Sequence, residues 1–290
     1  MRIAHLSDLH ALHLRGVSPF WFLNKRLAGG LNLLLRRGRR HGLPLLEALC
    51  DDLQQTAPDH VVVTGDLSNL SLPSELRWVR QVLDRLPLGP QGVTVIPGNH
   101  DIYVREAQRA RYFERCLGPY ALGDEPPADG LATFPFVRVR GELALIGACT
   151  ARPSPPPLAD GQLGRRQLAA LRQVLTAHKG RFRLLLLHHP PWRNRWWVLR
   201  GLRDRHALAR LLAEVGCELV LHGHEHRDEH HELPGPHGPI PVLGVGSGTC
   251  TDPHPARRAR YAIYTIEARR LVRIQRRVHD PATGRFVDLP

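Results

Sequence analysis

VTVIPGNHD, Val93–Asp101, joins a short apolar run to a polar turn that is rich in metal-binding and acid–base side chains. The run predicts a buried strand, because β-branched residues bounded by Pro and Gly are typical of strands. Asn99, His100 and Asp101 would then lie just past the carboxyl end of that strand. Since this edge of an open α/β sheet forms the ligand crevice, the segment predicts both a sheet and a site on its rim.

Four other segments repeat this layout of an apolar run followed by polar, ligand-type residues. They end in Asp8-Leu9-His10, Gly65-Asp66, His188-His189-Pro190-Pro191 and Gly223-His224-Glu225-His226. Strand ends that share one rim would gather carboxylates, imidazoles and an amide there. This mixture of nitrogen and oxygen donors suits Mn, Fe, Co, Ni or Zn. A carboxylate can bridge two metals, and a pair of metals ~3.5–4 Å apart suits in-line phosphoryl displacement.

No single motif is specific, since DxH and GD occur in many unrelated proteins. All five motifs in this order are specific. The order DxH, GD, GNHD, HxP and GHxH resembles the calcineurin-like metallophosphoesterase superfamily, and it runs from Asp8 to His226. The resemblance implies an α/β fold (an α+β sandwich), with two mixed β-sheets packed face to face and flanked by helices. It also implies a dinuclear metal site at the carboxyl ends of the strands.

The resemblance assigns a role to each motif residue. One metal would be held by Asp8, His10, Asp66 and His226, and the second by Asp66, Asn99, His188 and His224, so that Asp66 bridges. The family pattern His-any-Pro selects His188 as the ligand, and we expect His189 beside it on the substrate side. His100 matches the catalytic histidine. Asp101 is expected to hold the His100 imidazole through its second ring nitrogen.

Two divalent metal ions, Mn, Fe or Zn, are therefore the expected cofactors, and a metal-bridging hydroxide the expected nucleophile. GDLSN and GNHD differ from the GDYVDRG and GNHE of the Ser/Thr protein phosphatases. They favour the bacterial branch that resembles class III cyclic-nucleotide phosphodiesterases and glycerophosphodiesterases. The expected activity is thus hydrolysis of a phosphodiester.

There are three alternatives to a phosphodiesterase. The first is a membrane-surface pyrophosphatase acting on a lipid-linked nucleotide of the UDP-diacylglucosamine type, for which the motifs fit equally well. A nuclease is less favoured, because motifs for nucleic-acid recognition are missing. A non-catalytic scaffold is disfavoured, because every ligand position and His100 keep the expected residue types.

The composition is that of a globular protein, with 290 residues of which 42% are hydrophobic and 23% charged. The net charge of +13 predicts an anionic partner.

The sequence has no apolar run of about 18 residues, so it predicts no membrane-spanning helix. The amino terminus lacks the layout of a signal peptide. Five scattered cysteines predict no disulfide framework. We expect one cytoplasmic metallophosphoesterase domain over residues 1–290, and the sequence does not indicate its oligomeric state.

Apolar runs and 3.6-residue periods predict a mixed α/β order of elements. Strands are expected at Arg2–Leu6, His60–Thr64, Val93–Ile96, Phe134–Val139, Leu143–Gly147, Phe182–Leu187, Glu218–Leu221, Pro241–Val245, Tyr261–Ile266 and Leu271–Arg277. Helices are expected at Leu45–Gln55, Glu75–Leu86, Arg105–Cys116, Arg165–His178 and Ala207–Val215. Gly235–Pro241, GPHGPIP, is expected to be the turn of a hairpin.

The segment at about 12–43 differs from the rest, because it has no acidic residue. Its basic residues are Arg15, Lys25, Arg26, Arg36, Arg37, Arg39 and Arg40, and a helical stripe would contain Phe20, Leu23, Leu27 and Leu34. A basic amphipathic helix with aromatic residues is typical of interfacial helices. The segment therefore predicts peripheral binding to an anionic membrane surface at its inner face. The alternative is an insertion that packs its stripe on the sandwich. In both cases it would lie over the mouth of the site.

Overall fold

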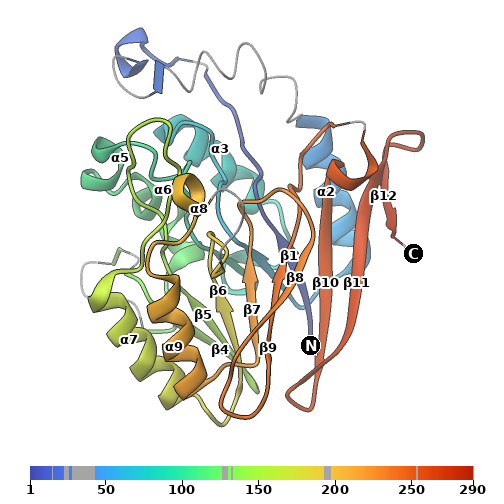
Figure 1. The fold of residues 1–290 in the computed structure, drawn as a ribbon. Coiled ribbons are helices and arrows are strands. Elements are labelled where there is room, and N and C mark those ends of the chain that lie inside the picture. Colours follow the sequence, from blue (N-terminus) through green and yellow to red (C-terminus); the bar gives the residue numbers. More distant parts are fainter. Residues whose placement is uncertain are drawn as a thin grey trace.

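The structure is a computed structural model that describes residues 1–14, 16–22, 26–27, 43–125, 130–131, 133–192, 197–252 and 254–289. One sheet has the order β12-β11-β10-β1-β2-β3 and the other the order β4-β5-β6-β7-β9-β8 (Figure 1). The first contains β1 (Arg2–Leu6), β2 (His60–Val63), β3 (Val93–Val95), β10 (Arg260–Glu267), β11 (Arg270–Asp280) and β12 (Arg285–Asp288). The second contains β4 (Phe136–Arg140), β5 (Leu143–Gly147), β6 (Phe182–Leu186), β7 (Leu219–His222), β8 (Glu229–Leu233) and β9 (Ile240–Gly244). The expected pair of mixed sheets is confirmed.

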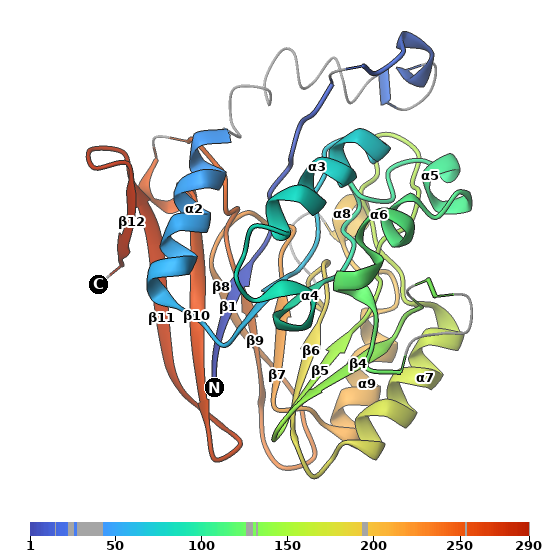
Figure 2. The same ribbon diagram turned by 180° about the vertical axis from the view of Figure 1, so that it is seen from behind.

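Helices cover the outer faces of both sheets, as Figures 1 and 2 show. Those on the side of the first sheet are α2 (Leu43–Thr56), α3 (Pro73–Leu83), α4 (Gly89–Gly92), α5 (Arg105–Arg109) and α6 (Tyr112–Ala121). Those on the side of the second are α7 (Gly164–Ala177) and α9 (Arg205–Val215), while α8 (Trp197–Arg200) lies at the end of this layer. The 3-10 helices η1 (Pro19–Phe22) and η3 (Pro255–Arg257) lie in connections.

The main apolar core lies between the two sheets, where Ile3 and Val62 from one and Leu145 and Leu184 from the other are fully buried. A second core fills the space between the second sheet and helices α7 and α9. β1, β2 and β3 run parallel, and so do β5, β6, β7 and β9. Their carboxyl ends therefore meet at one end of the sandwich, where the motifs begin.

The predicted strands begin and end within three residues of observed ones, but β8 and β12 are additional. β8 reads EHHEL, in which only Leu233 is buried. Both are edge strands, which pair through the backbone on one side and need no apolar run in the sequence. The expected hairpin turn at 235–241 is confirmed, because β8 and β9 pair antiparallel across it. No helix in the described part of the chain is long and apolar enough to span a membrane.

The predicted single helix Arg105–Cys116 is wrong, because the structure has two helices with a break at Arg111. This residue has a left-handed backbone, with φ of 53°. The sequence holds no Gly or Pro at this point to indicate the break.

Much of the expected amphipathic helix, at 23–25 and 28–42, lies outside the described residues, as does Arg15. The described part runs from the end of β1 toward the side where α3 and α5 lie (Figures 1 and 2). There Val17, Trp21 and Phe22 pack against buried Leu70 and Leu72, which supports an insertion seated on the sandwich.

Arg26 departs from the expectation of a solvent-facing basic residue. Its guanidinium is fully buried, donates to the carbonyl oxygens of Leu70 and Ser71, and pairs with Glu106 at 2.9 Å. Its charge is therefore neutralised within the protein.

Candidate metal centre

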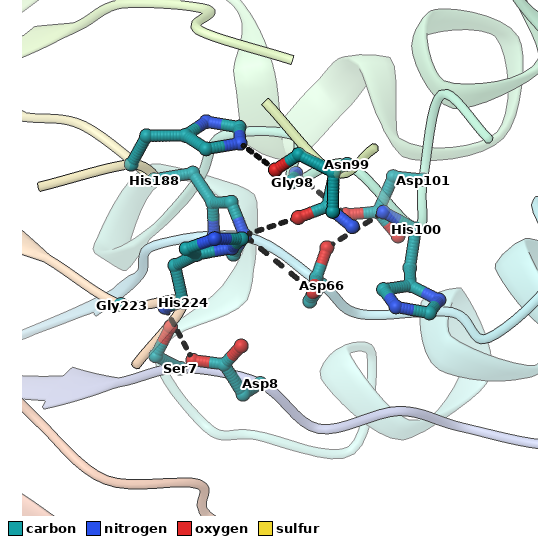
Figure 3. Close-up of polar contacts among 12 residues, drawn as sticks. Ser7, Asp8, Asp66, Gly98, Asn99, His100, Asp101, His188, Gly223 and His224 are labelled. Atoms are coloured by element: carbon teal, nitrogen blue, oxygen red, sulfur yellow. Dashed lines mark hydrogen bonds and ion pairs between the residues drawn. The ribbon is translucent and has the colours of Figure 1, made fainter. Parts of the chain in front are cut away.

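Figure 3 shows residues from the five predicted motifs gathered in one place, on the loops that follow β1, β2, β3, β6 and β7. Three overlapping groups of side chains place their ligand atoms within 4.8 Å of one another. They are Asp8-His10-His226, His10-Asp66-His100 and Asp66-His188-His224. All of these side chains except those of His100 and His226 are buried.

The first group centres on Asp8. Its Oδ1 lies 3.1 Å from Nε2 of His226 and 3.8 Å from Nε2 of His10. The two imidazoles meet with their Nε2 atoms 3.0 Å apart. Nε2 of His10 is also 3.9 Å from Oδ2 of Asp66.

The second group centres on His188, whose Nε2 lies 3.5 Å from Oδ2 of Asp66. The same nitrogen is 3.2 Å from Oδ1 of Asn99 and 3.2 Å from Nδ1 of His224. Oδ2 of Asp66 thus faces ligand atoms of both groups. This is the position that a bridging carboxylate occupies between two metals.

The donor atoms fit two cations. Nδ1 of His188 lies 2.7 Å from the carbonyl oxygen of Thr64, which can only accept, so Nδ1 carries a proton and Nε2 is the nitrogen left to bind a metal ion. The buried Oδ1 of Asp8 forms no hydrogen bond in the described part of the chain, although Nε2 of His226 lies 3.1 Å away. Buried imidazole nitrogens that face one another and an unbonded carboxylate oxygen are costly unless a cation lies between them.

Backbone conformation also sets the candidate ligands apart. Asp8, His10, Asp66, His224 and His226 all have positive φ, between 46° and 73°. Such left-handed conformations are uncommon outside glycine and concentrate at functional sites.

Two glycines of the motifs, Gly98 and Gly223, lie where no larger residue would fit. A Cβ on Gly98 would overlap the Asp66 carboxylate, and one on Gly223 would overlap Ser7 and approach Oδ2 of Asp8 to 2.7 Å. In the loops that carry the candidate ligands, the glycine backbone therefore packs directly against carboxylate groups.

Charge pairing between Asp66 and the histidines of the site shifts their pKa values in the direction opposite to burial, and its effect is the larger. Burial by itself would raise the pKa of Asp66, but His188 and His100 hold that pKa well below its usual value. Burial likewise disfavours the charged form of His188, yet Asp66 raises its pKa to about 9. The metal-free site thus keeps an ion pair here, and a metal ion must displace the His188 proton.

His100 lies beside the first group, with its ring edge-on to that of His10 at 4.9 Å. Its backbone N–H donates to Oδ1 of Asp66, and its Nδ1 lies 2.7 Å from the carbonyl oxygen of Asn69. The ring also stacks on Tyr103, with 5.4 Å between centroids and 12° between planes.

The expected contact between Asp101 and the His100 ring is wrong. The Asp101 carboxylate accepts hydrogen bonds from the backbone of Leu67, Ser68 and Gly98, and from the Ser68 hydroxyl. It therefore joins the loops after β2 and β3. A buried carboxylate is costly unless it is hydrogen-bonded, and these backbone donors satisfy it. Burial, followed by the nearby Asp66 charge, raises the pKa of Asp101 to about 7.

Asn69 holds the position that was expected of Asp101, and sequence reasoning missed it. Its carbonyl oxygen orients His100, and its side-chain amide donates to the carbonyl oxygen of His10. The run GDLSN places Asn69 three residues after Asp66, but nothing in that spacing indicates a backbone acceptor.

His189 does not face a substrate. Its ring is fully buried, with Nδ1 2.8 Å from Oγ1 of Thr150 and Nε2 3.2 Å from the carbonyl oxygen of Ala159. It packs 4.5 Å from the ring of His224. The expectation of a substrate-side histidine is wrong, because both nitrogens bond within the protein.

Comparison with known proteins agrees with this geometry. Residues 1–228 match the family model described as calcineurin-like phosphoesterase. A cAMP/cGMP dual specificity phosphodiesterase of Mycobacterium tuberculosis is 29% identical over 254 residues, covering 86% of this chain and 67% of that protein. The 3',5'-cyclic adenosine monophosphate phosphodiesterase CpdA of Haemophilus influenzae is 28% identical, covering 61% and 58%.

A third relative, the glycerophosphodiester phosphodiesterase GpdQ of Enterobacter lignolyticus, is 30% identical over 66% of this chain and 57% of its own. The matches thus span between 57% and 67% of these relatives. Among solved structures, a dimetal phosphatase from Danio rerio has a TM-score of 0.63 at 15% identity, with 95% of each chain covered. That likeness concerns the fold. The resemblance expected from the motifs is confirmed, and the chain belongs to the calcineurin-like phosphoesterase family.

Proposed function

We propose that this protein is a metal-dependent phosphodiesterase with a dinuclear centre. The observation that carries the proposal is the position of Asp66, whose Oδ2 faces Nε2 of His10 at 3.9 Å and Nε2 of His188 at 3.5 Å. One metal would be held by Asp8, His10, Asp66 and His226, and the other by Asp66, Asn99, His188 and His224. Bound divalent ions would supply a nucleophile from water at neutral pH and neutralise charge on the phosphoryl oxygens.

His100 is the candidate catalytic residue. The Asn69 carbonyl fixes the proton on Nδ1, so that Nε2 is the atom that acts on the substrate. Protonated at Nε2, His100 would donate a hydrogen bond to a phosphoryl oxygen or give its proton to the leaving alkoxide. Hydrolysis breaks one P–O bond, adds the elements of water and releases an alcohol and a phosphomonoester.

A diester is favoured over other phosphate esters by the relatives, whose names describe cyclic-nucleotide and glycerophosphodiester hydrolysis. The closed ring of a cyclic nucleotide and the open chain of a glycerophosphodiester share the monoanionic diester group. We therefore propose that group as the reacting part of the substrate.

The test is hydrolysis of bis(p-nitrophenyl) phosphate by protein reconstituted with Mn or Zn. His100→Asn should keep the parent's metal content and lose kcat by roughly 10²–10⁴-fold. Asp66→Ala should lose most metal from both positions. A reconstituted parent that binds no divalent metal, or that binds it without turnover, would contradict the proposal. A panel of cyclic AMP, glycerophosphodiesters, UDP-diacylglucosamine and single-stranded DNA then identifies the substrate.

A membrane-surface pyrophosphatase acting on a lipid-linked nucleotide is the second candidate. It is supported by exposed apolar side chains on the segment that leaves the first motif. Phe20 is 77% exposed, Leu27 63% and Leu14 44%. The surrounding sequence has no acidic residue from Leu9 to Leu46, which suits an anionic membrane at the cytoplasmic face.

Vesicle sedimentation separates the two candidates. A membrane-surface enzyme should bind anionic vesicles in a salt-sensitive way, and Phe20→Ser with Leu27→Ser should abolish that binding. Val198→Ser is the matched control, because Val198 is 65% exposed on α8. Equal binding to neutral and anionic vesicles, or to neither, excludes the second candidate.

A further inference from the structure

α8 lies at the end of the sandwich where the carboxyl ends of β6 and β7 meet the candidate metal centre (Figures 1 and 2). Arg200 is its last residue, and one guanidinium nitrogen, Nη2, donates to the carbonyl oxygen of His224 at 3.3 Å. The side chain is half-buried. Arg200 therefore lies next to a metal-binding loop without entering its set of ligands.

The charge of Arg200 has no counterpart. In the described part of the chain, no carboxylate forms an ion pair with it, whereas Arg203 pairs with the buried Asp160. The guanidinium is close enough to the site to act on it, because Nη2 contacts the backbone of His224 at 3.3 Å.

An unpaired cation at this position is unfavourable for metal binding alone. The seven candidate ligands include only two carboxylates, Asp8 and Asp66, so two dications would leave the centre positive. A further positive charge beside it repels metal ions. One phosphodiester group brings a single negative charge, which leaves part of this positive charge unbalanced.

We infer that Arg200 binds a second anionic group of the substrate, located in an arm of the diester that extends toward α8. A guanidinium fork suits the oxygens of a carboxylate or a phosphate. This inference rests on the proposed phosphodiesterase function and narrows its substrate class. The preferred substrate is a diester with an additional oxyanion, in contrast to a diester whose only charge is at the reacting phosphorus.

Two chromogenic diesters test the inference, p-nitrophenyl phenyl phosphate and p-nitrophenyl 4-carboxyphenyl phosphate. Both release p-nitrophenol, and they differ only in the carboxylate on the other arm. The parent should show a KM about tenfold lower for the carboxylated diester, the range of one charged hydrogen bond. Arg200→Gln should lose this preference and Arg200→Lys should keep part of it. A phosphate in place of the carboxylate shows which oxyanion binds better.

Arg203→Gln is the matched control, since it removes an equal charge that Asp160 already neutralises while Arg152 stays bound to Asp160. It should keep the parent's preference between the two diesters. If Arg203→Gln loses the preference as Arg200→Gln does, the effect is one of general surface charge and the inference is wrong.

Metal binding, measured by calorimetric titration with Mn, provides a readout that does not depend on turnover. Arg200→Gln should bind Mn as tightly as the parent or up to about threefold more tightly, because a repulsive charge is gone. Weaker Mn binding would show that Arg200 only clamps the His224 loop. Equal KM values for the two diesters in the parent overturn the inference alone. Failure of the metal-loaded parent to hydrolyse either diester overturns the proposed function and the inference with it.

Discussion

The candidate ligands combine conformations and contacts that are unfavourable on their own. Five of them have left-handed backbones, and two pairs of imidazole nitrogens lie 3.0 and 3.2 Å apart. Each left-handed non-glycine residue costs about 1–2 kcal/mol. Asp and His tolerate this conformation better than most residues. The residue types required for metal binding are therefore also among those that the loops can accommodate.

Glycine substitution tests whether His226, with φ of 55°, is strained. In metal-free protein, His226→Gly should be about 1 kcal/mol more stable to urea than His226→Ala, because glycine accepts positive φ without a steric penalty. His188 is the control, since it is not among the residues with positive φ. There the order should reverse, with alanine the more stable. The same order at both positions would argue against strain at His226.

Tyr103 is expected to position His100. Its ring stacks on the imidazole while the Asn69 carbonyl holds Nδ1. Tyr103→Ala should lower kcat about tenfold at unchanged metal content, because an imidazole that tilts loses its alignment. Tyr103→Phe keeps the ring and should retain the parent's kcat and pH profile. A loss in the phenylalanine variant as large as in the alanine variant would assign the effect to the hydroxyl group.

At the scale of elements, buried polar groups fix where helices meet sheets and loops. Asp52 on α2 accepts a hydrogen bond from the Tyr261 hydroxyl at 2.5 Å and pairs with Arg277, which joins the helix to β10 and β11. Glu75, in the first turn of α3, accepts hydrogen bonds from the backbone of Leu70 and Leu72. It thereby caps α3 and shapes the loop that carries Asn69.

Glu75 should make stability depend on pH. Burial is the main cause that raises its pKa from 4.5 to about 8. A carboxyl with a raised folded-state pKa favours folding below the unfolded value, near 4.5, and loses that contribution as pH rises through 8. The parent should therefore lose up to about 1.4 kcal/mol per pH unit in this window relative to Glu75→Gln.

Urea denaturation of both proteins at pH 5, 6.5, 8 and 9.5 measures this difference. The difference should grow up to about pH 8 and then remain constant. A difference independent of pH would show that Glu75 ionises normally in the folded protein.

For the whole molecule, the candidate metal centre joins the two sheets, because the loops after β1, β2 and β3 carry candidate ligands from one sheet and those after β6 and β7 carry them from the other. Metal bound there should stabilise the entire sandwich. A metal at about 1,000 times its Kd adds about 4 kcal/mol, which corresponds to a rise in Tm of roughly 5–10 °C at this size. Differential scanning calorimetry with Mn and with EDTA measures the rise.

Asp66→Ala tests whether the rise in Tm depends on the candidate ligands, since the Asp66 carboxylate faces both groups of ligand atoms. Its Tm should respond to Mn much less than that of the parent. A Tm of the parent that Mn does not change would indicate that the ligands are not assembled in the folded protein.

The sequence alone determined the approximate positions of the strands that lead into the site, the family and the residues that meet there. Apolar runs place strands, and ligand residues directly after five of them must gather wherever parallel strands end together. Local patterns could not show the edge strands β8 and β12, whose pairing is made by backbone groups. They also could not show the break at Arg111, which no turn residue marks.

Only the tertiary structure decided which atoms bond to which. It showed Asn69, in place of Asp101, as the partner of His100, a buried Arg26 and a His189 with both nitrogens occupied. It also brought Arg200 to the carbonyl oxygen of His224. A side chain's partner depends on which groups the folded chain brings within about 3 Å of it, and that distance is set by packing between elements far apart in the sequence.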